Sequence, residues 1–231
     1  MRQHKLAAIA CLGSLLVCST ARTTPQDSQQ NQLDTTAEDG AYQLAHNENS
    51  AQAKIKLLDD FVAKYPDSGL LPDVYRDYYL TYFATENYPQ VIDYADKLVA
   101  LGDKVSIDSR ILALVSREVA YSAGCTDPGL RTPDAYAKAT DAGRLGLQLI
   151  GQWQKPENLT DEQFAAGKKS FAIIFHGVTE MGESGLAGQM VICTPAPSPD
   201  RRATPPYDGR KLFDHLIDDL KTEHRRSPAV R

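Results

Sequence analysis

Histidine and cysteine are the residues of this 231-residue sequence that could hold a metal ion or take part in catalysis. A zinc site needs such residues clustered at short spacing. The five histidines are scattered along the chain, and the nearest pair, His215 and His224, is nine residues apart. That spacing does not place two side chains on one helical face. The sequence therefore predicts no metal site, and nothing in it indicates a cofactor.

Catalytic motifs are also missing. The sequence contains no Gly-x-Ser-x-Gly elbow, no phosphate-binding Walker motif and no dinucleotide fingerprint. His176 falls within a predicted helix beside its apolar stripe, and a catalytic base needs a nearby partner that the pattern does not supply. Carboxylates such as Glu183, Asp218 and Asp219 fall on helix faces, where they are usually solvated. We therefore expect no catalytic residue and no enzyme.

The four cysteines fall into two groups. Cys11 and Cys18 lie in an N-terminal apolar run, whereas Cys125 and Cys193 lie in the rest of the chain. In an oxidising compartment Cys125 and Cys193 could form a disulfide. Two unpaired thiols are favoured, because the sequence does not bring their Cα atoms together. Cys18 could carry a lipid anchor, but this is not favoured, because the preceding residue is normally small and here is Val17.

The first 21 residues have the pattern of a secretory signal peptide. Arg2 and Lys5 precede the uncharged run 6–17, and Ala21 ends a short stretch of small residues suited to cleavage. The run is too short to cross a bilayer, which takes about 20 residues, and no later segment is apolar enough to be transmembrane. We expect an exported protein, periplasmic or secreted, with an outer-membrane lipoprotein as the alternative.

Composition is that of a globular protein with a slight acidic excess. Hydrophobic residues make up 42%, charged residues 24%, and the formal net charge is -5. Nucleic-acid binding needs a clustered basic face, and the one basic cluster lies at residues 221–231. We therefore expect no nucleic-acid partner.

Apolar residues recur at helical spacing through most of the chain. The pattern predicts helices over residues 51–64, 72–85, 89–101, 106–122, 133–151 and 160–183. Residues 22–38 are polar and predict a disordered linker, and residues 186–206 are proline-rich and predict a second linker. Residues 207–231 predict an amphipathic C-terminal helix with a basic tail.

Two segments carry a resemblance to a known family. Residues 88–103, which begin Tyr-Pro-Gln-Val-Ile-Asp-Tyr-Ala, resemble the second half of a tetratricopeptide repeat, and residues 55–68 resemble the second helix of an earlier repeat. Tyr79 departs from the family, which prefers glycine there, and Ala95 is its expected small partner. The resemblance covers residues 39–185. It implies an all-α solenoid of antiparallel helix pairs, with a divergent C-terminal extension that folds back as a cap or is unrelated to the family.

The resemblance also implies where a partner would bind. The first helix of each pair lines the concave groove in this family. In residues 72–85 this puts four residues in the groove: Asp73, Arg76, Leu80 and Phe83. The packed face then holds Tyr78 and Tyr82. The expected function is a non-catalytic scaffold of the bacterial cell envelope that binds a protein or peptide. A self-associating helical domain, and an enzyme or subunit acting on envelope polymers, are the alternatives.

Overall fold

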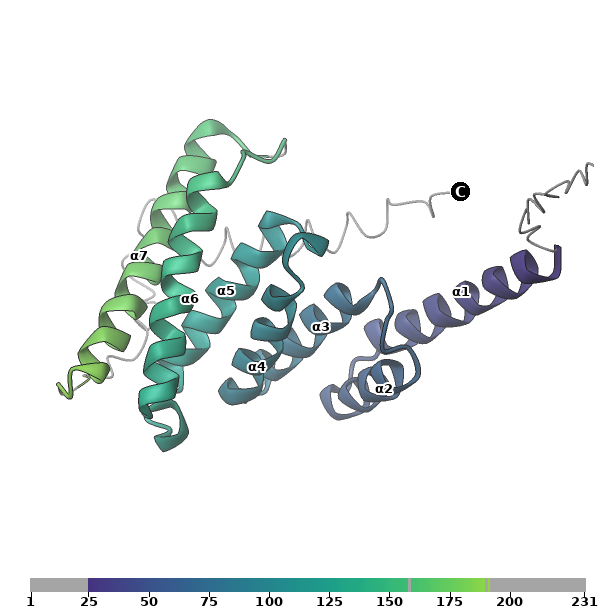
Figure 1. Ribbon diagram of the computed structural model, residues 1–231, viewed down its shortest axis with the longest axis horizontal. Helices are drawn as coiled ribbons and strands as arrows, with labels where there is room; N and C mark the ends of the chain where they lie inside the picture. Colours follow the sequence, from purple (N-terminus) through teal and green to yellow (C-terminus); the bar gives the residue numbers. More distant parts are fainter. Residues whose placement is uncertain (1–24, 158, 190, 192–231) are drawn as a thin grey trace, which may run out of the picture. The chain divides into compact units, whose positions relative to one another are not determined.

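The computed structural model describes residues 25–157, 159–189 and 191, with side chains from residue 36 onward. In this part of the chain all regular secondary structure is helical, in seven α-helices and two short 3-10 helices, and no strand occurs (Figure 1). The prediction of an all-α fold is confirmed. The predicted signal peptide, most of the second linker and the C-terminal helix lie outside the described residues. The chain divides into two compact units between Asp39 and Gly40.

The described helices follow one another with short connections. Their bounds are α1 (Pro25–His46), α2 (Ala51–Lys64), α3 (Leu71–Ala84), α4 (Tyr88–Ala100), α5 (Ile107–Ala123), α6 (Pro133–Gln152) and α7 (Asp161–Leu186). The 3-10 helices are Gly102–Lys104 and Pro128–Leu130. All six predicted helices are present, as α2 to α7.

Local capping explains where several helices begin and end. The Ser50 hydroxyl accepts from the backbone N–H of Ala53 at the start of α2. Thr160 and Gln163 form a capping box at the start of α7, with bonds of 2.9 and 3.1 Å. Gly102 follows α4 with a φ of 60°, a left-handed conformation that glycine adopts without strain.

The first helix differs from the sequence prediction. Residues 22–38 were expected to be a disordered linker, but α1 begins at Pro25. Proline suits the first turn of a helix, and no glycine or further proline interrupts residues 26–39. The end of α1 belongs to the second unit, where Tyr42 and Ala45 are buried with Phe61 and Val74. Polar composition alone did not reveal this anchoring.

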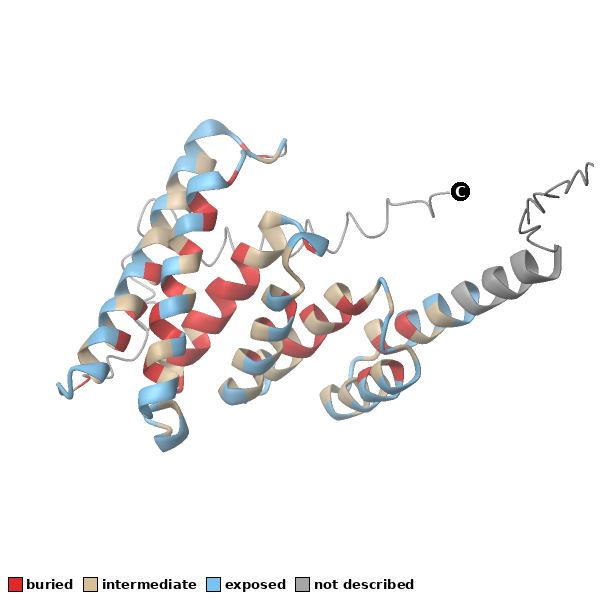
Figure 2. Cartoon of the chain, in the orientation of Figure 1, coloured by how far each residue is buried: buried red, intermediate tan, exposed pale blue. Residues whose placement is uncertain are grey.

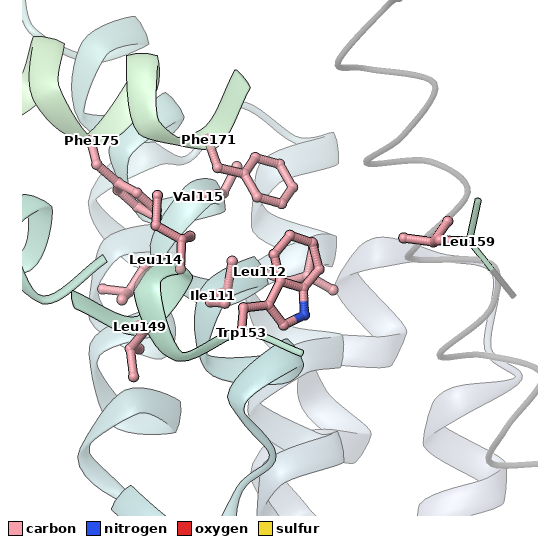
Figure 3. Close-up of a cluster of buried hydrophobic side chains, with 10 residues drawn as sticks. Ile111, Leu112, Leu114, Val115, Leu149, Trp153, Leu159, Phe171 and Phe175 are labelled. Atoms are coloured by element: carbon pink, nitrogen blue, oxygen red, sulfur yellow. The ribbon is translucent and has the colours of Figure 1, made fainter. Parts of the chain in front are cut away.

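The central element of the second unit is α5, which packs against α3, α4, α6 and α7. Eight consecutive residues, from Ile111 to Glu118, are buried (Figure 2). Its apolar side chains meet Leu149 of α6, Trp153 directly after α6, and Phe171 and Phe175 of α7 in the cluster of Figure 3. Because α5 is surrounded, it positions the helices on either side of it.

The last two helices, α6 and α7, approach each other closely through glycine. A Cβ atom on Gly143 of α6 would lie 2.8 Å from the carbonyl oxygen of Phe175, and one on Gly182 of α7 would lie 2.7 Å from that of Tyr136. Neither position has room for a side chain. Glycine therefore sets the separation of the two helix backbones.

Candidate functional site

Five polar side chains from α1 and α3 lie together. We call them the α1–α3 charged cluster: Tyr42, His46, Asp73, Arg76 and Asp77. All five belong to the second compact unit. Tyr42 and His46 are four residues apart, and Asp73 is followed by Arg76 and Asp77 at three and four residues, so each set shares one helix face. The cluster thereby connects the last turn of α1 to the first half of α3.

Within this cluster His46 and Asp77 form the closest contact between the two helices. Nδ1 of His46 lies 2.7 Å from Oδ2 of Asp77, and the Tyr42 hydroxyl donates to the same oxygen at 3.2 Å. Asp77 is buried, while the His46 side chain is 25% exposed. If the Asp77 carboxylate only accepts hydrogen bonds, Nδ1 of His46 is the donor in this contact. The other ring nitrogen, Nε2, is left on the far edge of the ring from Asp77.

The Arg76 guanidinium is buried but incompletely paired. Its Nη1 lies 2.8 Å from Oδ1 of Asp73, and its side chain is only 8% exposed. Its Nε and Nη2 atoms are also buried, and they have no hydrogen-bond partner in the described part of the chain. An unpaired buried donor costs roughly 1–3 kcal/mol, so a native fold that keeps one needs a reason. A bound group that supplies acceptor atoms would remove this cost.

Carboxylates outnumber the guanidinium in the cluster. Burial raises the pKa of Tyr42, and the nearby Asp77 carboxylate raises it further, so Tyr42 remains a hydroxyl donor. Burial, the largest single influence, opposes the charge of Arg76, but Asp73, Tyr42 and Asp77 together outweigh burial and raise the pKa of the guanidinium. One guanidinium thus faces two carboxylates. This excess of negative charge disfavours a strongly anionic ligand and favours a neutral acceptor, such as a main-chain carbonyl.

The structure separates the four residues predicted to line a groove. Asp73 and Arg76 belong to the α1–α3 charged cluster, but Arg76 is buried where an open groove position was expected. Leu80 and Phe83 are half-buried and pack against apolar core clusters, Phe83 with its ring centroid 6.3 Å from that of Tyr88. Side chains of neighbouring helices cover this face of α3. A prediction made from the sequence of α3 alone does not include these neighbours. The partner-binding role of the four residues remains a prediction.

Three members of the cluster were missed by the sequence analysis. Tyr42 and His46 lie just after the segment taken for a linker, and Asp77 is 31 residues beyond His46. Their only sequence signal is the i, i+4 spacing of Tyr42 and His46. That spacing has no meaning until α1 is known to be a helix that packs against α3.

The neighbouring tyrosines serve mainly as core. Tyr78 is buried and stacks on Tyr94, with ring centroids 3.9 Å apart, and its hydroxyl donates to Asp59 at 2.5 Å. Tyr82 is half-buried beside the same ring of Tyr94, at 5.7 Å. Tyr79 is buried in the same cluster as Ala95. The interpretation of Tyr78 as a core residue is confirmed, whereas Tyr82 is less buried than expected.

Cys125 takes part in a disulfide bond. It is buried in the loop that follows α5. The other cysteines of the sequence, Cys11, Cys18 and Cys193, all lie outside the described residues. Cys125 is therefore paired, unlike the unpaired thiol that the sequence favoured, and its pairing with Cys193 remains a prediction.

In the described part of the chain, no group of three or more His, Cys, Asp or Glu side chains could hold a metal ion. None of the helices described there has the length and apolar character needed to cross a membrane. Comparisons with models of protein families, with curated protein sequences and with solved structures give no match. The α1–α3 charged cluster is therefore the feature of the described residues from which a function is proposed.

Proposed function

We propose that this chain is a tetratricopeptide-like scaffold of the bacterial cell envelope that binds a segment of a protein partner at the α1–α3 charged cluster. The solenoid arrangement is supported by the packing of successive helices against one another. It is further supported by the burial of Tyr79 in one cluster with Ala95, the small partner expected where a tyrosine replaces the glycine that the family prefers. Export is supported by the disulfide at Cys125, since such bonds persist in oxidising compartments.

The observation that carries the proposal is the state of Arg76. Its Nε and Nη2 atoms are buried without partners, although Nη1 is paired with Asp73. Arginine presents these donors in a planar fork, which can engage two acceptor atoms together. His46 and Asp73 are half-buried, so a partner segment would have to displace their side chains to reach the buried donors of Arg76.

The chemistry of the cluster indicates the class of ligand. Two carboxylates already outnumber the one guanidinium, so an acidic side chain would meet Asp73 and Asp77 as well as Arg76. The carbonyl oxygens of an extended main chain accept hydrogen bonds without adding charge. We therefore assign the site to a neutral, extended stretch of polypeptide.

Photo-crosslinking in living cells tests the proposal. A benzophenone amino acid is placed at Gln43, an exposed position of α1 next to Tyr42. The matched control carries the same group at Lys169, an exposed position of α7. We expect an adduct with a second protein from position 43 and a much weaker one from position 169. The adduct from position 43 should disappear when Arg76→Lys is added, because lysine lacks the Nε and Nη2 donors.

Two results would count against this function. An adduct of twice the chain's own mass from position 43 would indicate self-association instead. Equal adducts from positions 43 and 169, or an adduct from position 43 that survives Arg76→Lys, would show that Arg76 does not hold the partner.

A further inference from the structure

We infer that Cys125 is bonded to Cys193, and that this disulfide ties the chain beyond α7 to the loop between α5 and α6. The inference does not depend on the proposed partner site. It starts from the bonded state of Cys125, a buried residue directly after α5.

Val191 supplies the geometric argument. It is the last described residue, and it is buried in a cluster with Tyr121, Tyr136, Ala139 and Val178. Tyr121 lies in the last turn of α5, four residues before Cys125. Cys193 follows Val191 by two residues, and each residue extends a chain by at most about 3.6 Å. Because Val191 shares this buried cluster with Tyr121, we infer that the chain two residues further on can reach Cys125.

The other two cysteines are poor partners. Cys11 and Cys18 fall within the predicted signal peptide, which cleavage after Ala21 would remove. The bond forms when the Cys125 and Cys193 thiols lose two protons and two electrons. A dithiol–disulfide exchange protein of an oxidising compartment would accept them, its own disulfide being reduced to two thiols.

The bond would close a covalent loop that contains α6 and α7. Val191 would then be held by a covalent tie as well as by packing. Such a loop restricts the unfolded chain, so its removal should lower thermal stability. The stability loss should be the same whichever of the two cysteines is replaced.

Peptide mapping of the full chain, purified from the exported fraction without reductant, tests the pairing. Trypsin places Cys125 in residues 118–131, Cys193 in residues 170–201 and both N-terminal cysteines in residues 6–22. We expect a species in which 118–131 is linked to 170–201 and which reductant separates. Cys125→Ser and Cys193→Ser should each lower the melting midpoint by about 10 °C. The double variant should have the same melting midpoint as either single variant.

Several results would overturn the inference. One is residues 118–131 linked to residues 6–22, and another is residues 118–131 recovered with an alkylated free thiol. A third is a melting midpoint that falls for Cys125→Ser alone, because an isolated packing defect at Cys125 would then explain the loss.

Discussion

Glu118 is fully buried beside Arg117, and its Oε1 accepts a hydrogen bond from Nη1 of that arginine at 3.0 Å. Its Oε2 is buried without a partner among the described atoms. The Nε atom of Arg117 also donates to Asp96 of α4, at 2.6 Å. Burial raises the pKa of Glu118 to about 8, even though Arg117 opposes the rise. The Glu118 carboxyl group is completely removed from water and one of its oxygens is unpaired, and this raises its pKa by more than the single contact with Arg117 lowers it.

This carboxyl group makes stability depend on pH. The folded protein keeps the Glu118 proton up to about pH 8, whereas the unfolded chain releases it near the ordinary value of 4.5. The contribution of Glu118 to the free energy of unfolding is therefore fully present below pH 4.5 and is lost as the pH rises towards 8. We expect Glu118→Gln to raise the free energy of unfolding by roughly 1–3 kcal/mol at pH 8 and to change it little at pH 4.5.

Urea unfolding of both proteins at the two pH values measures this difference. Glu180→Gln is the matched control, because Glu180 is exposed on α7. A Glu118→Gln variant that gains nothing at pH 8, or gains equally at both pH values, would contradict the assigned burial.

Helix positions were predictable from local chemistry. Ser50, Thr160 and Gly102 act at helix ends through hydrogen bonds and a backbone angle that involve only nearby residues. Such interactions are contained in a short stretch of sequence. For this reason the six predicted helices and their ends agree with α2 to α7.

Burial and the candidate site depend on packing that a local pattern does not contain. The Arg117–Glu118 pair looks like the polar face of an amphipathic helix, but α5 has neighbours on all sides and no solvent face there. The same limitation applies to Arg76, which was expected to be open and is buried. His46 could not be paired with Asp77 without knowing that the end of α1 packs on α3.

Glycine substitutions test the close packing of α6 and α7. Gly143→Ala places a Cβ atom 2.8 Å from the Phe175 carbonyl oxygen, and we expect it to lower the free energy of unfolding by roughly 1–3 kcal/mol. Gly177→Ala is the matched control, since its Cβ would have nothing within 4 Å. Alanine favours a helix, so Gly177→Ala should raise stability by about 0.5–1 kcal/mol. Thermal melting that shows both variants changing in the same direction would contradict this packing.

Two tyrosines of α3 should differ in their importance for stability. Tyr78 is 1% exposed and stacks on Tyr94 at 3.9 Å, so Tyr78→Ala should cost roughly 3–5 kcal/mol. Tyr82 is half-buried at the edge of the same group, and Tyr82→Ala should cost about 1–2 kcal/mol. Chemical denaturation of both variants measures the difference. Equal losses would mean that Tyr82 is as deeply packed as Tyr78.

Affinity for the crosslinked partner, measured by titration calorimetry with the Arg76→Lys variant, tests partner binding at the α1–α3 charged cluster most directly. Lysine keeps a positive charge beside Asp73 but removes the Nε and Nη2 donors. Arg144→Lys is the control, because Arg144 pairs with Glu183 at the exposed surface of α6 and α7. We predict that Arg76→Lys weakens binding at least about 10-fold, equivalent to about 1.4 kcal/mol. Its melting temperature should change little. Arg144→Lys should bind the partner with the same affinity as the parent protein. Unchanged affinity in Arg76→Lys, or an equal loss in both variants, would contradict partner binding at this cluster.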